Sequence, residues 1–188
     1  MFMRKSGFVF ILCILFVWAV SCVGEKYLRP YTPGVYCDEE AFNDHKDLWN
    51  GSSVKNYTYT LCYDSFPPQN YTVAVTVSDG SVSEWVLKKY SGKEEITEEE
   101  KKEFESFLED NKDFLLIESV YELFSACISE AYNKYTEYSD CYYSSFDFSF
   151  SEEVPFISYC KNTSLLMKED VDGNGGYVEI QIKDFKPQ

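Results

Sequence analysis

The most regular alternation of apolar and polar side chains lies in residues 56–87. Aromatic and aliphatic residues occupy every second position at 57–63 and 71–77, and a shorter apolar run follows at 82–87. A period of two residues predicts half-buried β-strands. Asp79-Gly80 between the second and third runs favours a tight hairpin turn, and the proline pair at 67–68 separates the first run from the second. The pattern therefore predicts a three-strand antiparallel meander.

Two helices are predicted after the meander. Thr97 and Glu100 form a capping box, which indicates a helix start. The surrounding segment, 93–113, is strongly acidic and is predicted to be a solvated helix face. A second helix is expected to start at Ser119, with Glu122 three residues later. Its apolar stripe has helical spacing and comprises Val120, Leu123, Phe124, Cys127, Ile128 and Ala131. We expect this stripe to lie across the meander.

The last third of the chain returns to strand-like patterns. Phe146, Phe148 and Phe150 alternate with polar residues. Three further runs follow, at 154–160, 164–167 and 177–185. The predicted fold class is α+β: an antiparallel β-sheet, built from the N-terminal three-strand meander and the C-terminal strands, packed by two central helices.

The N-terminus has the pattern of an export signal. Arg4 and Lys5 precede an apolar run at 8–20, which is shorter than the roughly 20 residues that span a membrane. Small residues then lead directly into Cys22, as in a lipoprotein signal peptide whose cleavage leaves a lipidated cysteine at the new N-terminus. An ordinary secretory signal fits the same residues, because Ala19 and Ser21 also form a small-residue cleavage site.

These patterns predict three parts of the chain. A lipoprotein-type signal peptide occupies 1–21, a tether 22–47, and a single α+β domain 48–188. The tether is expected to become ordered towards its end, where residues 38–49 fit a short helix with Phe42 and Trp49 on one side. A fatty acid on Cys22 would anchor the protein to a membrane outside the cytoplasm. The formal net charge of −15 opposes binding to nucleic acid. The expected partners are therefore the membrane, through the lipid, and a protein, peptide or glycan ligand.

Two cysteines flank a predicted hairpin in the C-terminal third. If the strand that starts near Cys141 turns back near Phe150, Cys160 lies opposite Cys141 and a disulfide can form, because a bridge needs Cα atoms within about 7 Å. A turn nearer Glu152 would move the two cysteines out of register. The hairpin register therefore decides this bridge.

The other cysteines are assigned by their place in the chain. Cys37 with Cys62 is the companion pair, which would tie the tether to the first strand. Cys127 is then the unpaired thiol in the core. No C-x-x-C pair is present in the sequence, so neither a zinc site nor a thioredoxin-like centre is predicted.

One segment resembles the start of a calcium loop. Asp170, Asp172 and Asn174 place oxygen ligands at alternating positions. The twelfth position of such a loop would be Gln181, which cannot supply the bidentate carboxylate. A glycine-rich turn explains the same residues, and no metal is expected. An extracellular calcium-binding domain remains the third functional alternative.

The sequence offers no recognisable catalytic constellation. His45 is the only histidine, and no nucleophile-elbow or glycine-rich phosphate loop accompanies it. We therefore expect no enzymatic activity and no cofactor, and interpret the protein as a lipid-anchored binding or structural module. The alternative is a secreted inhibitor or host-interaction protein, which would carry glycans on its sequons at Asn50, Asn56, Asn70 and Asn162.

Several of these pieces, in this order, resemble an uncharacterised family of exported bacterial proteins, domain of unknown function 6174. The matching features are Trp49, the strand at 56–59, the hairpin at 73–82, Gly92, the helix start at 117–124, the strand at Pro155, and the late turn at Asp172 before the strand ending in Lys183-Asp184-Phe185. The resemblance covers about residues 45–186. It implies a lipoprotein or secreted protein with a meander, a helix and further strands, and it implies no catalytic residues.

Overall fold

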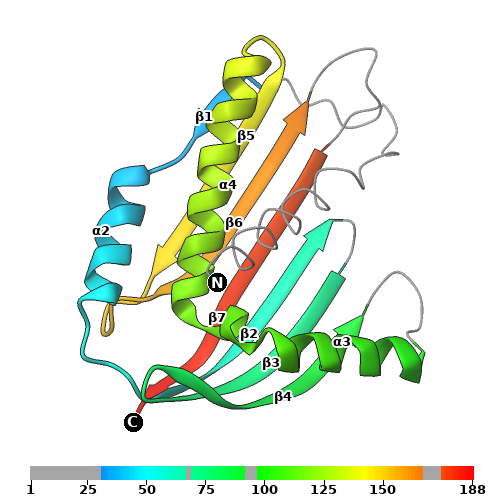
Figure 1. Ribbon diagram of the computed structural model, residues 1–188. Coiled ribbons are helices and arrows are strands. Elements are labelled where there is room, and N and C mark those ends of the chain that lie inside the picture. The colour runs from blue at the N-terminus through cyan, green and yellow to red at the C-terminus, as the bar shows by residue number, and fades with distance from the viewer. Residues whose placement is uncertain (1–30, 67–68, 92–96, 167–174) are drawn as a thin grey trace, which may run out of the picture.

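The computed structural model describes residues 31–66, 69–91, 97–166 and 175–188. The strands are β1 (Gly34–Tyr36), β2 (Tyr57–Phe66), β3 (Gln69–Ser78), β4 (Ser81–Ser91), β5 (Tyr142–Phe150), β6 (Ile157–Leu166) and β7 (Gly175–Pro187). The helices are α2 (Glu39–Asn50), α3 (Glu98–Asp110), the short 3₁₀ helix η2 (Lys112–Leu115) and α4 (Ile117–Glu137). All seven strands form one mixed sheet, in the order β1-β5-β6-β7-β2-β3-β4 (Figure 1).

The predicted α+β class is confirmed, but the strand arrangement differs from the predicted one. β2, β3 and β4 are antiparallel neighbours, and Asp79 and Gly80 turn between the last two with φ angles of 51° and 74°. The C-terminal strand β7 pairs with β2, so it joins the meander to β5 and β6. β1 was not predicted, and it adds to β5 in parallel. A period of two identifies strands but does not identify their neighbours, which explains the difference.

The helices lie on one face of the sheet (Figure 1). Phe124 of α4 contacts Phe148 of β5 at a ring-centroid distance of 6.0 Å, and Phe104 of α3 contacts Tyr71 of β3 at 5.1 Å. Phe148 and Tyr71 belong to the sheet face that also carries the buried residues of β2. That face and the helices enclose the core, and we call it the inner face.

α4 differs from the predicted second helix in its start and in its location. It begins at Ile117, and the hydroxyl of Ser119 donates to the carbonyl of Asp113 at 2.7 Å. It packs on β5 and β6 instead of the meander. The predicted stripe is otherwise largely correct: Val120, Phe124, Ile128 and Ala131 are buried, and Leu123 and Cys127 are half-buried. The aromatic inner residues of β5, which include Phe146 and Phe148, supply the apolar surface that this stripe needs.

The segment predicted as a tether contains part of the fold. β1 and most of α2 lie within 22–47, and Phe42 of α2 is only 1% exposed. The Asp38 side chain accepts from the Ala41 amide at 3.1 Å and caps the start of α2. Pro30, Pro33 and Gly34 led to the tether prediction. The short helix predicted over 38–49 is confirmed by α2, whose buried residues are Phe42 and Trp49. No helix among the described residues is long and apolar enough to cross a membrane.

Candidate binding surface on the open sheet face

The face of the sheet opposite the helices carries a row of polar side chains. We call it the open face. Cross-strand pairs place Asp147 of β5 beside Lys161 of β6, Lys161 beside Glu179 of β7, and Glu179 beside Asp64 of β2. Each of these residues alternates with inner-face residues of its strand, so all four side chains share the open face. Strand pairing therefore brings together residues that are up to 115 positions apart, Asp64 and Glu179.

Two hydrogen bonds, an ion pair and a cation–π contact connect side chains of the open face into a network, which we call the open-face network and define as Asp64, Lys161, Tyr177, Glu179 and Gln181. Lys161 Nζ lies 3.3 Å from Glu179 Oε2, and Gln181 Nε2 donates to Glu179 Oε1 at 2.8 Å. The Tyr177 hydroxyl donates to Asp64 Oδ1 at 3.0 Å. Lys161 Nζ also lies 5.5 Å from the centre of the Tyr177 ring. The side chains are thus held in place before any ligand arrives, which reduces the entropy lost on binding.

Neighbouring groups shift the pKa values within the network. The hydrogen bond to Glu179 raises the pKa of Lys161, so its ammonium group stays charged at neutral pH. Partial burial, together with the hydrogen bond to Asp64, raises the pKa of Tyr177 and keeps its hydroxyl protonated. Both groups therefore keep their usual protonation states at neutral pH, and the network presents a fixed ammonium and a fixed hydroxyl.

A shallow depression of about 190 Å³ adjoins the network. It crosses four neighbouring strands, from β7 to β4, and is lined by Cys62, Tyr63, Asp64, Asn70, Tyr71, Thr72, Lys89, Glu179 and Gln181. The open-face network therefore forms one side of a concave, largely polar surface.

Tyrosine rings frame the polar row. Tyr159 of β6 pairs with Gln181, directly beside the network. At the β1–β5 edge, the Tyr143 ring lies 4.5 Å from Tyr31 and 5.5 Å from Tyr36, measured between centroids. Tyr36 is 47% exposed, so this edge presents aromatic surface to solvent. Aromatic rings next to fixed polar groups are common in binding sites.

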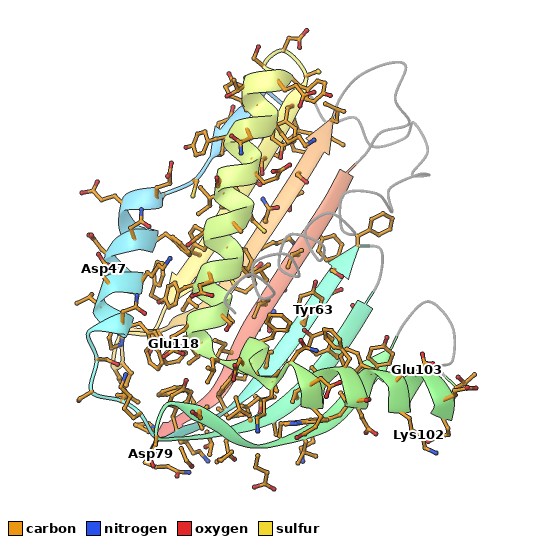
Figure 2. The ribbon with its side chains drawn as sticks, viewed as in Figure 1. Asp47, Tyr63, Asp79, Lys102, Glu103 and Glu118 are labelled. Atoms are coloured by element: carbon orange, nitrogen blue, oxygen red, sulfur yellow. The ribbon has the colours of Figure 1, made fainter. Side chains whose placement is uncertain are left out.

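The two layers differ in charge. α2 and α4 together carry eight acidic residues and two lysines, and α3 is also rich in glutamate. Figure 2 labels two solvent-exposed residues of α3, Lys102 and Glu103, and Asp47 on α2. The open-face network and the depression instead combine two carboxylates, Asp64 and Glu179, with two lysines, Lys161 and Lys89. The chain's negative charge therefore resides mainly on the helix layer.

A family model for a family of unknown function, DUF6174, matches residues 41–142, more than half of the chain. The chain belongs to the DUF6174 family. No curated protein and no solved structure matches it. The DUF6174 match runs from α2 to the first residue of β5. Asp64 lies inside it, whereas the other four members of the open-face network lie beyond its end.

The predicted Cys141–Cys160 bridge of this DUF6174 protein is wrong for the register observed. β5 and β6 are joined by a turn over 151–156, closed by the Ser151 amide donating to the Phe156 carbonyl at 3.0 Å. This turn places Cys160 opposite Phe148. Phe148 lies six residues after Tyr142 along β5, and Cys141 comes directly before Tyr142, so the two cysteines are far apart. This is the turn nearer Glu152, the alternative that moves the two cysteines out of register. No disulfide joins any of the five cysteines in the part of the chain that the structure describes.

The companion pair Cys37–Cys62 is also separated. Cys37 directly follows β1 and Cys62 lies in β2, with three strands between them. At about 4.8 Å per strand, the distance is far beyond the reach of a disulfide. Cys62 instead lines the depression on the open face.

The remaining site predictions fall on other parts of the chain. The lipidation site Cys22 and the calcium candidates Asp170, Asp172 and Asn174 lie outside the described residues. His45 is a packing residue: its ring stacks on Phe150 with centroids 3.7 Å apart, and its Nδ1 lies 2.9 Å from the Ala41 carbonyl.

The cysteine environments predict the order of thiol labelling. Burial raises the pKa of Cys160 well above its usual value, and burial together with Glu39 and Asp38 raises that of Cys37 to about 12. Because the thiolate is the reactive form, both should react slowly with iodoacetamide at pH 8. Mass spectrometry should find five labelled positions among 31–188 after denaturation, and Cys62 labelled before Cys160 in the native protein. Recovery of a bridged cysteine pair, or fastest labelling at Cys160, would contradict these environments.

Three core tyrosines predict alkaline unfolding. Burial raises the pKa of Tyr57, Tyr59 and Tyr121 above 10, and the Glu118 carboxylate at the start of α4 (Figure 2) further raises those of Tyr57 and Tyr59. A tyrosine whose pKa is higher in the folded than in the unfolded state stabilises the fold fully when the pH is below its unfolded pKa of about 10. That stabilisation is lost as the pH rises through the folded-state pKa. The free energy of unfolding should therefore fall above pH 10, by up to about 1.4 kcal/mol per pH unit for each buried tyrosine.

Absorbance at 295 nm measures this behaviour. Exposed tyrosines should ionise reversibly. Tyr57, Tyr59 and Tyr121 should ionise only when circular dichroism shows that the protein loses its structure. Ionisation of all 16 tyrosines in one step, with the fold intact, would contradict the burial of these three.

Proposed function

We propose that this DUF6174 protein is a non-enzymatic binding module that presents its open face to a ligand outside the cytoplasm. The observation that carries the proposal is the open-face network, in which Lys161, Glu179 and Gln181 are fixed by mutual contacts on an accessible surface. Such an arrangement restrains polar groups that serve no role in the core. The network lies on a broad face beside a shallow depression of about 190 Å³. This shape suits a ligand that contacts the face over an extended area.

The edges of the sheet support the open face as the binding surface. β4 is an edge strand with two register irregularities relative to β3. It also carries Lys88 and Lys89. Bulges and lysines on an edge strand hinder the addition of another strand. At the other edge, β1 spans only three residues. A partner that adds a strand is therefore disfavoured at both edges.

A lipid anchor would hold this face near a membrane. The apolar run at 8–20 and the small residues before Cys22 support processing to a lipidated cysteine. Cys22→Ala should leave an unprocessed precursor that incorporates no labelled fatty acid, whereas Cys13→Ala, inside the signal, should be processed normally. Processing of the Cys22→Ala variant to a product free of lipid would favour secretion instead.

Ligand capture by the full chain tests the binding role. The protein, immobilised in detergent, is incubated with the solubilised surface fraction of the cells that produce it. Wild type should retain material that a Tyr159→Ala/Glu179→Ala double variant loses. The matched control is Tyr132→Ala/Glu122→Ala on α4, which removes the same side-chain types from exposed helix positions and should retain the material. Equal retention by both double variants would contradict a role for the open face.

A further inference from the structure

We infer that the ligand of the open face is a neutral oligosaccharide, seated from Tyr159 and Lys161 of β6 across the depression between β7 and β4. This inference rests on the proposed binding function and names the class of ligand. It depends on three properties of the surface: its pattern of donors and acceptors, its shape, and its charge.

The open-face network alternates donors and acceptors at close range. Lys161 offers an ammonium donor, Glu179 a carboxylate acceptor, and Gln181 an amide with both functions. The Lys161–Glu179 contact of 3.3 Å and the Gln181–Glu179 bond of 2.8 Å hold the three groups side by side. Adjacent hydroxyls of a sugar ring each donate and accept, so they match such an array. Hydrogen bonds to charged groups are also the stronger ones.

The shape of the surface fits a short chain. The depression crosses from β7 to β4, which is three strand spacings or about 14 Å. It is shallow and open, so a chain can continue beyond it in either direction. The Tyr159 ring, beside Gln181, gives a flat apolar surface next to the polar row. A ring with an electron-rich face packs well against the C–H groups of a sugar.

The charge of the surface selects among ligands. Three carboxylates, Asp64, Asp147 and Glu179, face two lysines, Lys161 and Lys89, so the mixed charge of −1 favours neither a polyanion nor a polycation. Charged residues are depleted from the centres of protein–protein interfaces. Here they occupy the centre, and aromatic residues lie around them. This distribution disfavours a folded protein partner and favours a hydroxyl-rich neutral ligand.

Saturation-transfer NMR on the full chain in detergent micelles tests the inference. The probes are maltotriose, cellotriose, chitotriose and mannotriose, each added separately. At least one should receive saturation on its ring protons. Tyr159→Ala and Glu179→Gln should each weaken its binding by about tenfold or more, because each removes a contact with the sugar. Tyr132→Ala and Glu122→Gln on α4 are the matched controls and should bind like wild type.

The possible results separate the two proposals. If no probe receives saturation but capture still depends on Tyr159 and Glu179, the glycan inference is wrong and the binding function stands. If capture is also independent of these residues, both proposals are wrong. Saturation that persists unchanged in both open-face variants would overturn the placement of the sugar on this surface.

Discussion

Phe124→Ala should lower the free energy of unfolding by about 3–5 kcal/mol. Phe124 is fully buried between α4 and the sheet, and its ring contacts Phe148 with an interplanar angle of 78°. Truncation removes the apolar surface and leaves a cavity that the rigid strands below cannot fill. Urea denaturation followed by circular dichroism measures the change.

Asn133→Ala is the control on the same helix, because Asn133 is exposed. It should change the free energy of unfolding by less than about 0.5 kcal/mol. If Phe124→Ala costs no more than Asn133→Ala, α4 does not pack on β5 and β6, and the architecture is wrong.

Phe42→Ala should destabilise the protein by a similar amount, about 3–5 kcal/mol. Phe42 is 1% exposed, and its ring lies 4.8 Å from Phe148 and 5.6 Å from Tyr121. This variant tests whether α2 belongs to the folded domain, because the sequence pattern placed Phe42 in a tether. A residue in a tether contributes nothing to stability.

Leu48→Ala is the matched control on α2. Leu48 is also a large apolar residue, but it is 56% exposed. Its truncation should cost less than about 1 kcal/mol, since little apolar surface is buried there. A small effect of both variants would mean that α2 does not pack on the sheet in solution.

Local sequence patterns predicted most of the elements. The alternation at 57–63 corresponds to buried Tyr57, Tyr59, Leu61 and Tyr63, and Asp79-Gly80 forms the expected turn. These features depend on neighbours along the chain, so the sequence is sufficient to predict them.

The open-face network could not be predicted in the same way. The run at 177–185 predicted a strand there, but not that this strand, β7, lies between β6 and β2. Only this non-local pairing brings Lys161 to Glu179 and Tyr177 to Asp64. The Cys141–Cys160 prediction failed for a related reason, because a turn displaced by a few residues changes every cross-strand pair.

The central claim is that the ligand covers the open face and leaves the helix layer accessible. Carboxyl footprinting with a carbodiimide and an amine tests it most directly, on the full chain with and without the captured surface material. Glu179 is 22% exposed, so it can be labelled in the free protein. Bound material should protect Glu179 from labelling and leave the labelling of Glu122 on α4 unchanged. Protection of Glu122 with unchanged labelling of Glu179 would contradict the claim.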